Sequence, residues 1–298
     1  MVAGTPRLVL VTRRTPFEEL LGRHATRGQA AAFLSRRGLK LELLEQRHEA
    51  TRAAERQAGA LAPGEWRRAS VERGQLDRFL FEAEDLVVAV GQDGLVANLA
   101  KYLSGQPVIG LNPLPALYDG VLVKHAVAAL PPLLAAAAAG KATLERRTMV
   151  EARLDDGQRL LALNEIFVGH RSHQSARYAL RWGGQEERHS SSGVIVAGGP
   201  GCTGWARSIC EERGQHPPVP APADPALLFL VREAFPSGTT GTALTAGLID
   251  AGERLEIVSE MDSGGLAFGD GIESDWVEFA WGQRLTLTRA QETLNLVL

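Results

Sequence analysis

Apolar positions in the first part of the chain fall into short continuous runs separated by segments of helical composition. Residues 8–11, 86–90 and 107–111 are apolar runs of strand length, and such continuous runs are typical of buried parallel strands. Helical composition or spacing marks residues 28–37, 41–59, 71–82, 95–103 and 121–139. We expect Pro131-Pro132 to break or kink the last of these helices. This order predicts strand–helix–strand units.

Beyond about residue 141 the pattern changes to shorter segments typical of β-strands. Segments 148–154 and 159–163 flank the turn signal Asp155-Asp156-Gly157 and predict a hairpin. The prolines between 217 and 225 predict a stiff surface loop. Further strands are expected at 176–182, 193–197, 227–231, 254–259, 276–280 and 284–288, with a helix at 205–212.

Together the two patterns predict an α/β fold class, with a Rossmann-like N-terminal domain followed by a β-rich, sandwich-like C-terminal domain. A chain of 298 residues is long enough for two packed domains. We place the first domain at residues 1–140 and the second at residues 141–283. The last strand, within residues 284–298, is expected to return and complete the first domain.

Composition and charge exclude several classes of protein. The hydrophobic content of 45% is typical of folded globular chains, and the apolar stretches are interrupted by polar residues or proline, so we expect no transmembrane helix. The two cysteines are too few for a disulfide framework or a zinc site, which favours a reducing cytoplasm. The net charge is −3, although the first 78 residues are basic. No aromatic residues interleave with these arginines, which argues against nucleic-acid binding.

The segment Gly91-Gln92-Asp93-Gly94 lies where a buried strand meets a helix. Ligands of open α/β sheets gather at this carboxyl edge, and glycines let the backbone approach a phosphate closely. Asp93 would hold Mg²⁺ or accept a proton from an attacking hydroxyl, because phosphoryl transfer needs mainly positioning and charge neutralisation. The alternative is an ordinary Gly-Asp turn, since short glycine motifs are common.

A second glycine-rich segment, residues 198–204, leads into the expected helix at Trp205. Its glycines and the following helix start are suited to binding an anion, with the Thr203 hydroxyl as a further donor. The thiol of Cys202 at a helix start could have a lowered pKa, but no base to pair with it is identifiable.

Two other polar clusters admit a metal. His170-Arg171-Ser172-His173 lacks a third ligand at a convincing spacing and is better explained as a polar loop. The acids within residues 268–275 could bind Mg²⁺ or Ca²⁺ through oxygen ligands, or form a solvated turn. We assign no metal-binding residue from either cluster.

Four segments in this order resemble motifs of the NAD kinase-like family, which is related to the diacylglycerol kinase catalytic fold. Residues 88–95, Val-Ala-Val-Gly-Gln-Asp-Gly-Leu, resemble its Gly-Gly-Asp-Gly-Thr signature, and residues 107–112 resemble the strand that follows. Residues 163–166, Leu-Asn-Glu-Ile, are similar to its Asn-Glu motif, and residues 193–205 to its nucleotide loop. The resemblance is specific over residues 84–209, whereas the helical segment 15–82 has no counterpart that we can place.

The chain also departs from the family pattern. Gln92 replaces the second glycine, Leu95 replaces the threonine, and Cys202 and Trp205 stand where many members have serine and tyrosine. The segment that begins Asn112-Pro113 lacks the usual glycine-rich continuation. Each change removes or weakens a polar contact, which identifies the chain as a divergent member.

The resemblance implies a function and roles for single residues. It implies ATP-dependent phosphorylation of a hydroxyl on NAD or a related nucleotide, with Mg²⁺, in a cytoplasmic homo-oligomer whose second domain binds substrate and forms the interface. Asp93 is the implied catalytic residue, and Asn164 and Glu165 would contact the substrate. A non-catalytic nucleotide sensor and a kinase of sugars or lipids remain the alternatives. Residues implied in nucleotide or phosphate binding are Gly91, Gln92, Gly94, Gly201, Cys202, Thr203, Gly204 and Trp205.

Overall fold

The computed structural model describes residues 6–298. The chain divides into two compact units, the first made of residues 1–145 and 295–298 and the second of residues 146–294. None of the described helices is long and apolar enough to cross a membrane.

The first unit is built on a parallel sheet with the strand order β2-β1-β3-β4. The strand β3 is buried along its whole length, as its continuous apolar sequence predicts. The end of β16 adds to this sheet, because Asn295 and Leu296 pair in parallel with β4. The strands are β1 (Arg7–Thr12), β2 (Arg67–Glu72), β3 (Asp85–Val90), β4 (Pro107–Leu111) and β16 (Arg284–Val297).

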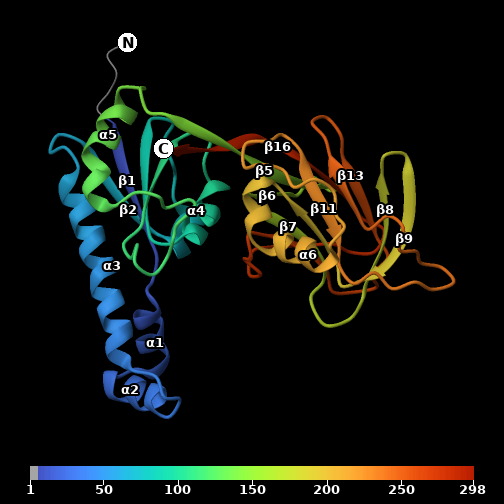
Figure 1. Cartoon of the computed structure of the whole chain (residues 1–298), viewed down its shortest axis with the longest axis horizontal. Helices are drawn as coiled ribbons and strands as arrows, with labels where there is room; N and C mark the ends of the chain where they lie inside the picture. Colours follow the sequence, from blue (N-terminus) through green and yellow to red (C-terminus); the bar gives the residue numbers. More distant parts are fainter. Residues whose placement is uncertain (1–5) are drawn as a thin grey trace. The chain divides into compact units, whose positions relative to one another are not determined.

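Three helices connect β1 to β2: α1 (Pro16–His24), α2 (Arg27–Ser35) and α3 (Leu41–Leu61). The second half of α3 packs on the sheet through Ala54 and Ala58. Its first half continues past the sheet beside α1 and α2 (Figure 1). There the three helices share a small core of their own around Leu20, Leu34 and Leu41. We call residues 16–47 of this helical segment the helical arm.

The remaining elements of the first unit are short. The 3₁₀ helix η1 (Arg73–Arg78) follows β2, and α4 (Asp93–Ala100) connects β3 to β4. A second 3₁₀ helix, η2 (Val127–Ala129), leads into α5 (Leu130–Ala138), which packs against β3 and β4 through Leu130 and Leu134.

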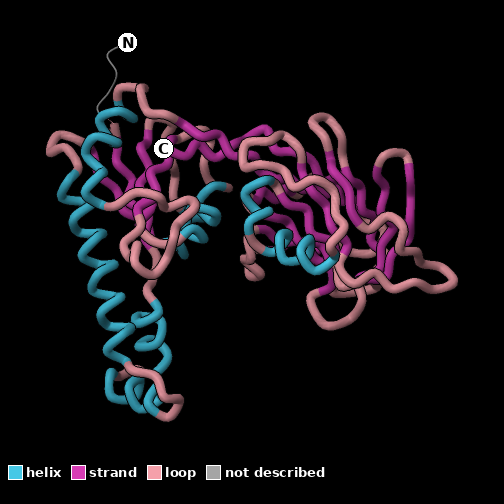
Figure 2. Tube along the Cα trace, viewed as in Figure 1, coloured by secondary structure: helices cyan, strands magenta, loops and turns pink. Residues whose placement is uncertain are grey.

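The second unit is mostly strand (Figure 2). One of its sheets has the order β12-β11-β10-β7-β14-β15, and the other contains β5, β6, β8, β9, β13 and most of β16. Side chains from both sheets, among them Ile166, Tyr178 and Phe229, share one core, so the unit is a sandwich. Its elements are β5 (Leu144–Leu154), β6 (Arg159–Ala162), β7 (Glu165–His170), β8 (Ala176–Trp182), β9 (Gln185–Ser191), β10 (Val194–Ala197), η3 (Gly199–Thr203), α6 (Trp205–Arg213), β11 (Leu227–Val231), β12 (Ala246–Ile249), β13 (Leu255–Ser259), β14 (Gly265–Gly269) and β15 (Trp276–Glu278).

The α/β fold class predicted from the sequence, with a parallel sheet first and a β-rich sandwich second, is confirmed. The predicted strand–helix–strand unit over 86–111 and the hairpin at Asp155-Asp156-Gly157 are also confirmed. The predicted helix at 71–82 is wrong: Val71 pairs beside Val11 as part of an edge strand, and Leu80 is 82% exposed.

The helix predicted at 121–139 is shorter than expected. It begins at Leu130, so that Pro131 and Pro132 fall in its first turn, where a missing N–H group removes no helical hydrogen bond. The expected break of the stretch 121–139 therefore occurs, but just before the prolines, which lie at the start of the shorter helix.

Candidate functional site

The first candidate site lies at the carboxyl edge of the parallel sheet. Strands β1, β3 and β4 are neighbours and run in the same direction. The residues that follow them, Arg13, Gly91 and Asn112, therefore meet at one edge of the sheet, which is where open α/β sheets bind ligands.

Gly91 makes the turn from β3 to α4. Its N–H group donates to the Leu111 carbonyl at 3.1 Å, which extends the pairing with β4 by one bond. Beneath it, Leu95 is fully buried, and its side chain would lie 3.2 Å from a Cβ at Gly91. Leu95 is therefore part of the core at the position where the family motif has a hydroxyl. Gly94 is exposed in the first turn of α4, and Gln92 precedes that helix without a side-chain cap bond.

The half-buried Asp93 side chain holds the backbone of a distant segment. Its Oδ1 accepts the N–H groups of Leu122 at 2.7 Å and Val123 at 3.1 Å, and its Oδ2 accepts that of Val121 at 2.9 Å. The same segment packs against β4, because a Cβ at Gly110 would lie 2.1 Å from the Leu122 carbonyl oxygen. Asp93 thus anchors residues 121–123 at the edge of the sheet.

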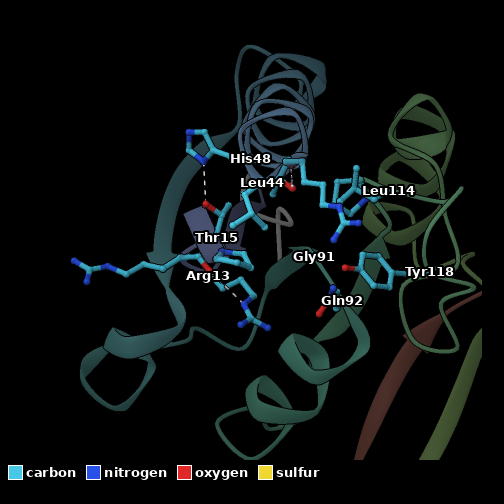
Figure 3. A pocket seen from close by; sticks show the side chains of 13 residues that line it. Arg13, Thr15, Leu44, His48, Gly91, Gln92, Leu114 and Tyr118 are labelled. Atoms are coloured by element: carbon cyan, nitrogen blue, oxygen red, sulfur yellow. Dashed lines mark hydrogen bonds between the residues drawn. The ribbon is translucent and has the colours of Figure 1, made fainter. Parts of the chain in front are cut away.

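A pocket opens beside Gly91 and Gln92 (Figure 3). Together with the solvent-open space at its mouth, it spans about 610 Å³. Four segments line it: the chain after β1 with the start of α1, the first half of α3, the turn after β3, and the chain after β4. The lining residues are Arg13, Arg14, Thr15, Pro16, Leu44, Arg47, His48, Thr51, Gly91, Gln92, Pro113, Leu114 and Tyr118.

A hydrogen-bond network fixes one wall of this pocket. Thr15 caps α1 in a reciprocal arrangement with Glu18, and its hydroxyl lies 2.9 Å from His48 Nδ1 (Figure 3). Arg52 of α3 bonds to the carboxylates of Glu18 and Glu55. Burial raises the pKa of Glu55, while Arg52 opposes that rise. The network joins the chain after β1 to α3.

The arginines that line the pocket have no acidic partner. Arg52 occupies the nearby carboxylates, and within residues 6–298 neither Arg13, Arg14 nor Arg47 forms an ion pair. Unpaired cations beside an aromatic ring, that of Tyr118, and a glycine turn make a site suited to a phosphorylated ligand.

The second candidate site lies in the second unit, where Asn164 and Glu165 begin β7. The glycine-rich loop packs directly against them: Gly198 N–H donates to the Asn164 carbonyl at 3.1 Å, and a Cβ at Gly201 would lie 2.0 Å from the same oxygen. The two motifs that the sequence assigned to nucleotide and substrate binding are thus brought together in this unit.

Within the loop, several polar groups are already bonded. The Thr203 hydroxyl donates to the Pro200 carbonyl at 3.0 Å, and the N–H groups of Gly201, Cys202 and Gly204 donate to carbonyls inside the loop. Burial raises the pKa of the Cys202 thiol to about 12, helped by Cys210 and Glu165, which is opposite to the lowering considered from the sequence. Cys202 is therefore a buried packing residue and not an activated nucleophile.

Among the described residues the carboxylate of Glu165 has no hydrogen-bond partner at this site, because its neighbour Asp270 is bonded to backbone instead. Asp270 accepts the N–H groups of Leu163 and Asn164, so its carboxylate holds the turn before β7. Burial and then the charge of Asp270 raise the pKa of Glu165 to about 7. Its carboxylate forms no hydrogen bond with any other residue of the described chain.

Trp205 closes this site as an aromatic surface. Its ring stacks on Phe167 with centroids 5.8 Å apart, and the Arg232 guanidinium lies 5.0 Å from the ring centroid. The side chain is only half-buried.

Sequence reasoning missed the basic and aromatic lining of the first pocket. Arg13 follows a strand that was predicted, so its place at the carboxyl edge could have been recognised from the sequence. Arg47 and Tyr118 gave no such signal, because they come from a helix predicted without a partner and from a loop.

The comparisons with known proteins agree with this architecture. No protein-family model matches the chain. An NAD kinase of Heliobacterium modesticaldum is 35% identical over 132 residues, a match that covers 42% of this chain and 46% of that relative, so the chain matches about half of the relative's length.

Two solved structures share the fold over almost the whole chain. Yeast NADH kinase complexed with NADH has a TM-score of 0.60 at 15% identity, covering 100% of this chain and 84% of that one. An NAD kinase from Archaeoglobus fulgidus in complex with ATP has a TM-score of 0.57 at 20% identity, covering 98% of this chain and 93% of that one. In fold, and in sequence over the matched segment, the chain is NAD kinase-like.

Proposed function

We propose that the chain is an NAD kinase-like phosphotransferase that moves a phosphoryl group from ATP to a hydroxyl of NAD or a related nucleotide. The pocket at Gly91 and Gln92 is the observation that carries the proposal, because it places unpaired arginines at the carboxyl edge of a parallel sheet. The matched relatives include an NAD kinase and an NADH kinase, which supports this acceptor class.

In this proposal the two candidate sites bind different parts of the ligands. The chain around Gly91, Gln92 and Gly94 binds phosphate oxygens. Asn164 and Glu165 bind the substrate nucleotide, with the loop from Gly201 to Trp205 beside them. The unbonded Glu165 carboxylate supports this role, since it is free to accept a ribose hydroxyl or an adenine amino group.

Asp93 is the proposed catalytic residue, although its carboxylate is already bonded to the backbone. Its carboxylate accepts three backbone N–H groups, so accepting a proton would require it to give up or share those bonds. Mg²⁺ is the expected cofactor, yet the described residues contain no group of three metal-ligating side chains. We assign Mg²⁺ mainly to phosphate oxygens of ATP and derive no step through it.

A non-catalytic nucleotide sensor is the second candidate function. Two observations favour the sensor. The Asp93 carboxylate is already bonded to backbone, and Leu95 is a buried apolar residue, so the pocket lacks two polar groups that the family motif supplies. A sensor would bind NAD or ATP without turnover.

The test is formation of NADP. The purified chain is incubated with ATP, Mg²⁺ and NAD, and NADP is detected with an NADP-specific dehydrogenase; NADH, sugars and diacylglycerol serve as other acceptors. We expect phosphorylation of NAD or NADH, and loss of turnover in Asp93→Ala. A raised melting temperature with NAD but no ADP release from any acceptor would establish the sensor instead.

We also propose that the protein is a cytoplasmic homo-oligomer with its interface on the second unit. The buried free thiols of Cys202 and Cys210 suit a reducing compartment. The edge strand β15 carries Trp276, which is 45% exposed, and Trp281, a few residues after the strand, is 62% exposed. Sedimentation of the wild type and of Trp281→Ser measures the oligomeric state and its dependence on this surface.

A further inference from the structure

The residues of α3 that line the pocket form one face of the helix. Leu44, Arg47, His48 and Thr51 are spaced by three and four residues, which places them in one stripe. The stripe continues through Ala54 and Ala58, which are buried against the sheet. The inward face of α3 therefore carries small apolar residues where it covers the sheet. Beyond the sheet the same face carries mainly polar residues.

This change of residue type marks a ligand-facing surface. A helix face that only packs against its neighbours keeps apolar residues along its length. Here Arg47 interrupts the stripe, forms no ion pair within the described chain, and lines the same pocket as Gly91 and Gln92. The guanidinium is exposed at the pocket wall, where it is free to meet a ligand.

The partners of Arg47 across the pocket define the ligand chemistry. Arg13 contributes a second unpaired cation from the chain after β1, so positive charge comes from two elements at two places on the pocket wall. Guanidinium groups bind phosphate oxygens in a bidentate manner. Two separated guanidinium groups suit a chain of several phosphates better than a single phosphate, which can neutralise only one of them closely.

We infer that Arg47 of the helical arm is a phosphate-binding residue that, together with Arg13, binds the phosphate chain of the donor nucleotide. The inference rests on the proposed function in taking that chain to belong to the donor. The apolar and aromatic lining from Leu44, Leu114 and Tyr118 gives the base or ribose of the same nucleotide a surface to contact. The helical arm thus adds a donor contact to the glycine turn of the sheet.

The test compares Arg47→Ala with Arg56→Ala. Both arginines are exposed on α3, and neither forms an ion pair within residues 6–298, but Arg56 does not line the pocket. Binding of ATP, AMP, NAD and inorganic tripolyphosphate is measured by calorimetry without any second substrate. Melting curves confirm that each variant is folded, and Arg47→Lys tests whether charge alone suffices.

We expect Arg47→Ala to weaken ATP and tripolyphosphate about tenfold, as for loss of a charged hydrogen bond, and to change AMP and NAD less than about twofold. Arg56→Ala should match the wild type, and Arg47→Lys should lie between. Equal ATP affinity in Arg47→Ala and Arg56→Ala overturns the inference, as does a loss confined to NAD, which would assign the pocket to the acceptor. If ATP binding depends on Arg47 but no NADP forms, the inference holds and the kinase proposal fails.

Discussion

The anchoring role of Asp93 can be tested by removing its carboxylate. In Asp93→Ala the N–H groups of Leu122 and Val123 lose their acceptor, and both residues are at least 96% buried, with exposures of 4% and 1%. Each buried donor left without a partner costs about 1–3 kcal/mol, so the two together destabilise the segment by roughly 2–6 kcal/mol. The N–H of exposed Val121 finds water instead.

Amide hydrogen exchange of residues 121–123 measures this directly. A loss of about 2 kcal/mol corresponds to exchange that is faster by about 30-fold. Asp119→Ala is the matched control, because Asp119 is exposed in the same loop and forms no bond within the described chain. Unchanged protection of Leu122 and Val123 in Asp93→Ala would refute the anchoring argument.

Asp93→Asn separates anchoring from chemistry. The amide oxygen can still accept the two buried N–H groups, while its NH₂ group replaces the acceptor for Val121. We therefore expect exchange at Leu122 and Val123 to stay close to that of the wild type. If NADP formation nevertheless falls by a hundredfold or more, Asp93 also takes part in the chemistry; if turnover persists, Asp93 is a positioning residue.

Three further results are expected in the second unit. Folding raises the pKa of Glu165 from 4.5 to about 7, so the folded chain becomes less stable as pH rises through that window and the half-buried carboxyl must ionise. Glu165→Gln removes this cost. In urea titrations it should be about 1–3 kcal/mol more stable than the wild type at pH 8 and close to it at pH 4.5. In Gly201→Ala the new Cβ would lie 2.0 Å from a carbonyl oxygen, so the chain should be destabilised by about 2 kcal/mol or more. The control is Gly238→Ala, where nothing lies within 4 Å and stability should stay within about 0.5 kcal/mol of the wild type. Equal urea midpoints for the two variants would contradict the close packing at Gly201. Both buried thiols, Cys202 and Cys210, should resist a disulfide reagent at pH 8 until urea unfolds the chain, and a thiol labelled within minutes would show that the site opens.

The parts of the fold that could be predicted are those whose pattern is local. The strand β3 is a continuous apolar run that ends at a glycine, and the helix and strand that follow have their own composition, so the unit over 86–111 follows from the sequence. The strand β9 was missed because its sequence, Gln-Glu-Glu-Arg-His-Ser-Ser, is almost entirely polar. It forms by pairing along its length with β8, which no local pattern records.

The pocket could be predicted only in part, for a related reason. The glycine turn is visible because its residue types are unusual at the end of a strand. Arg47 is one of several arginines on a helix, and composition cannot distinguish it from Arg56, which lies nine positions later on the same helix. What separates them is the helix face: nine positions are about two and a half turns, so Arg56 lies opposite the face of α3 that lines the pocket.

Both units place an aspartate after a glycine turn, and both use it to hold backbone. Asp93 accepts three N–H groups from residues 121–123, and Asp270 accepts those of Leu163 and Asn164. The oxygens of both carboxylates are committed to backbone N–H groups and fix a loop. An aspartate in this setting is therefore weak evidence for a general base when read from the sequence alone. The Glu165 carboxylate differs in each respect. It accepts no hydrogen bond from the described chain, it is half-buried near a second carboxylate, and its pKa of about 7 lets it take up and release a proton near neutral pH.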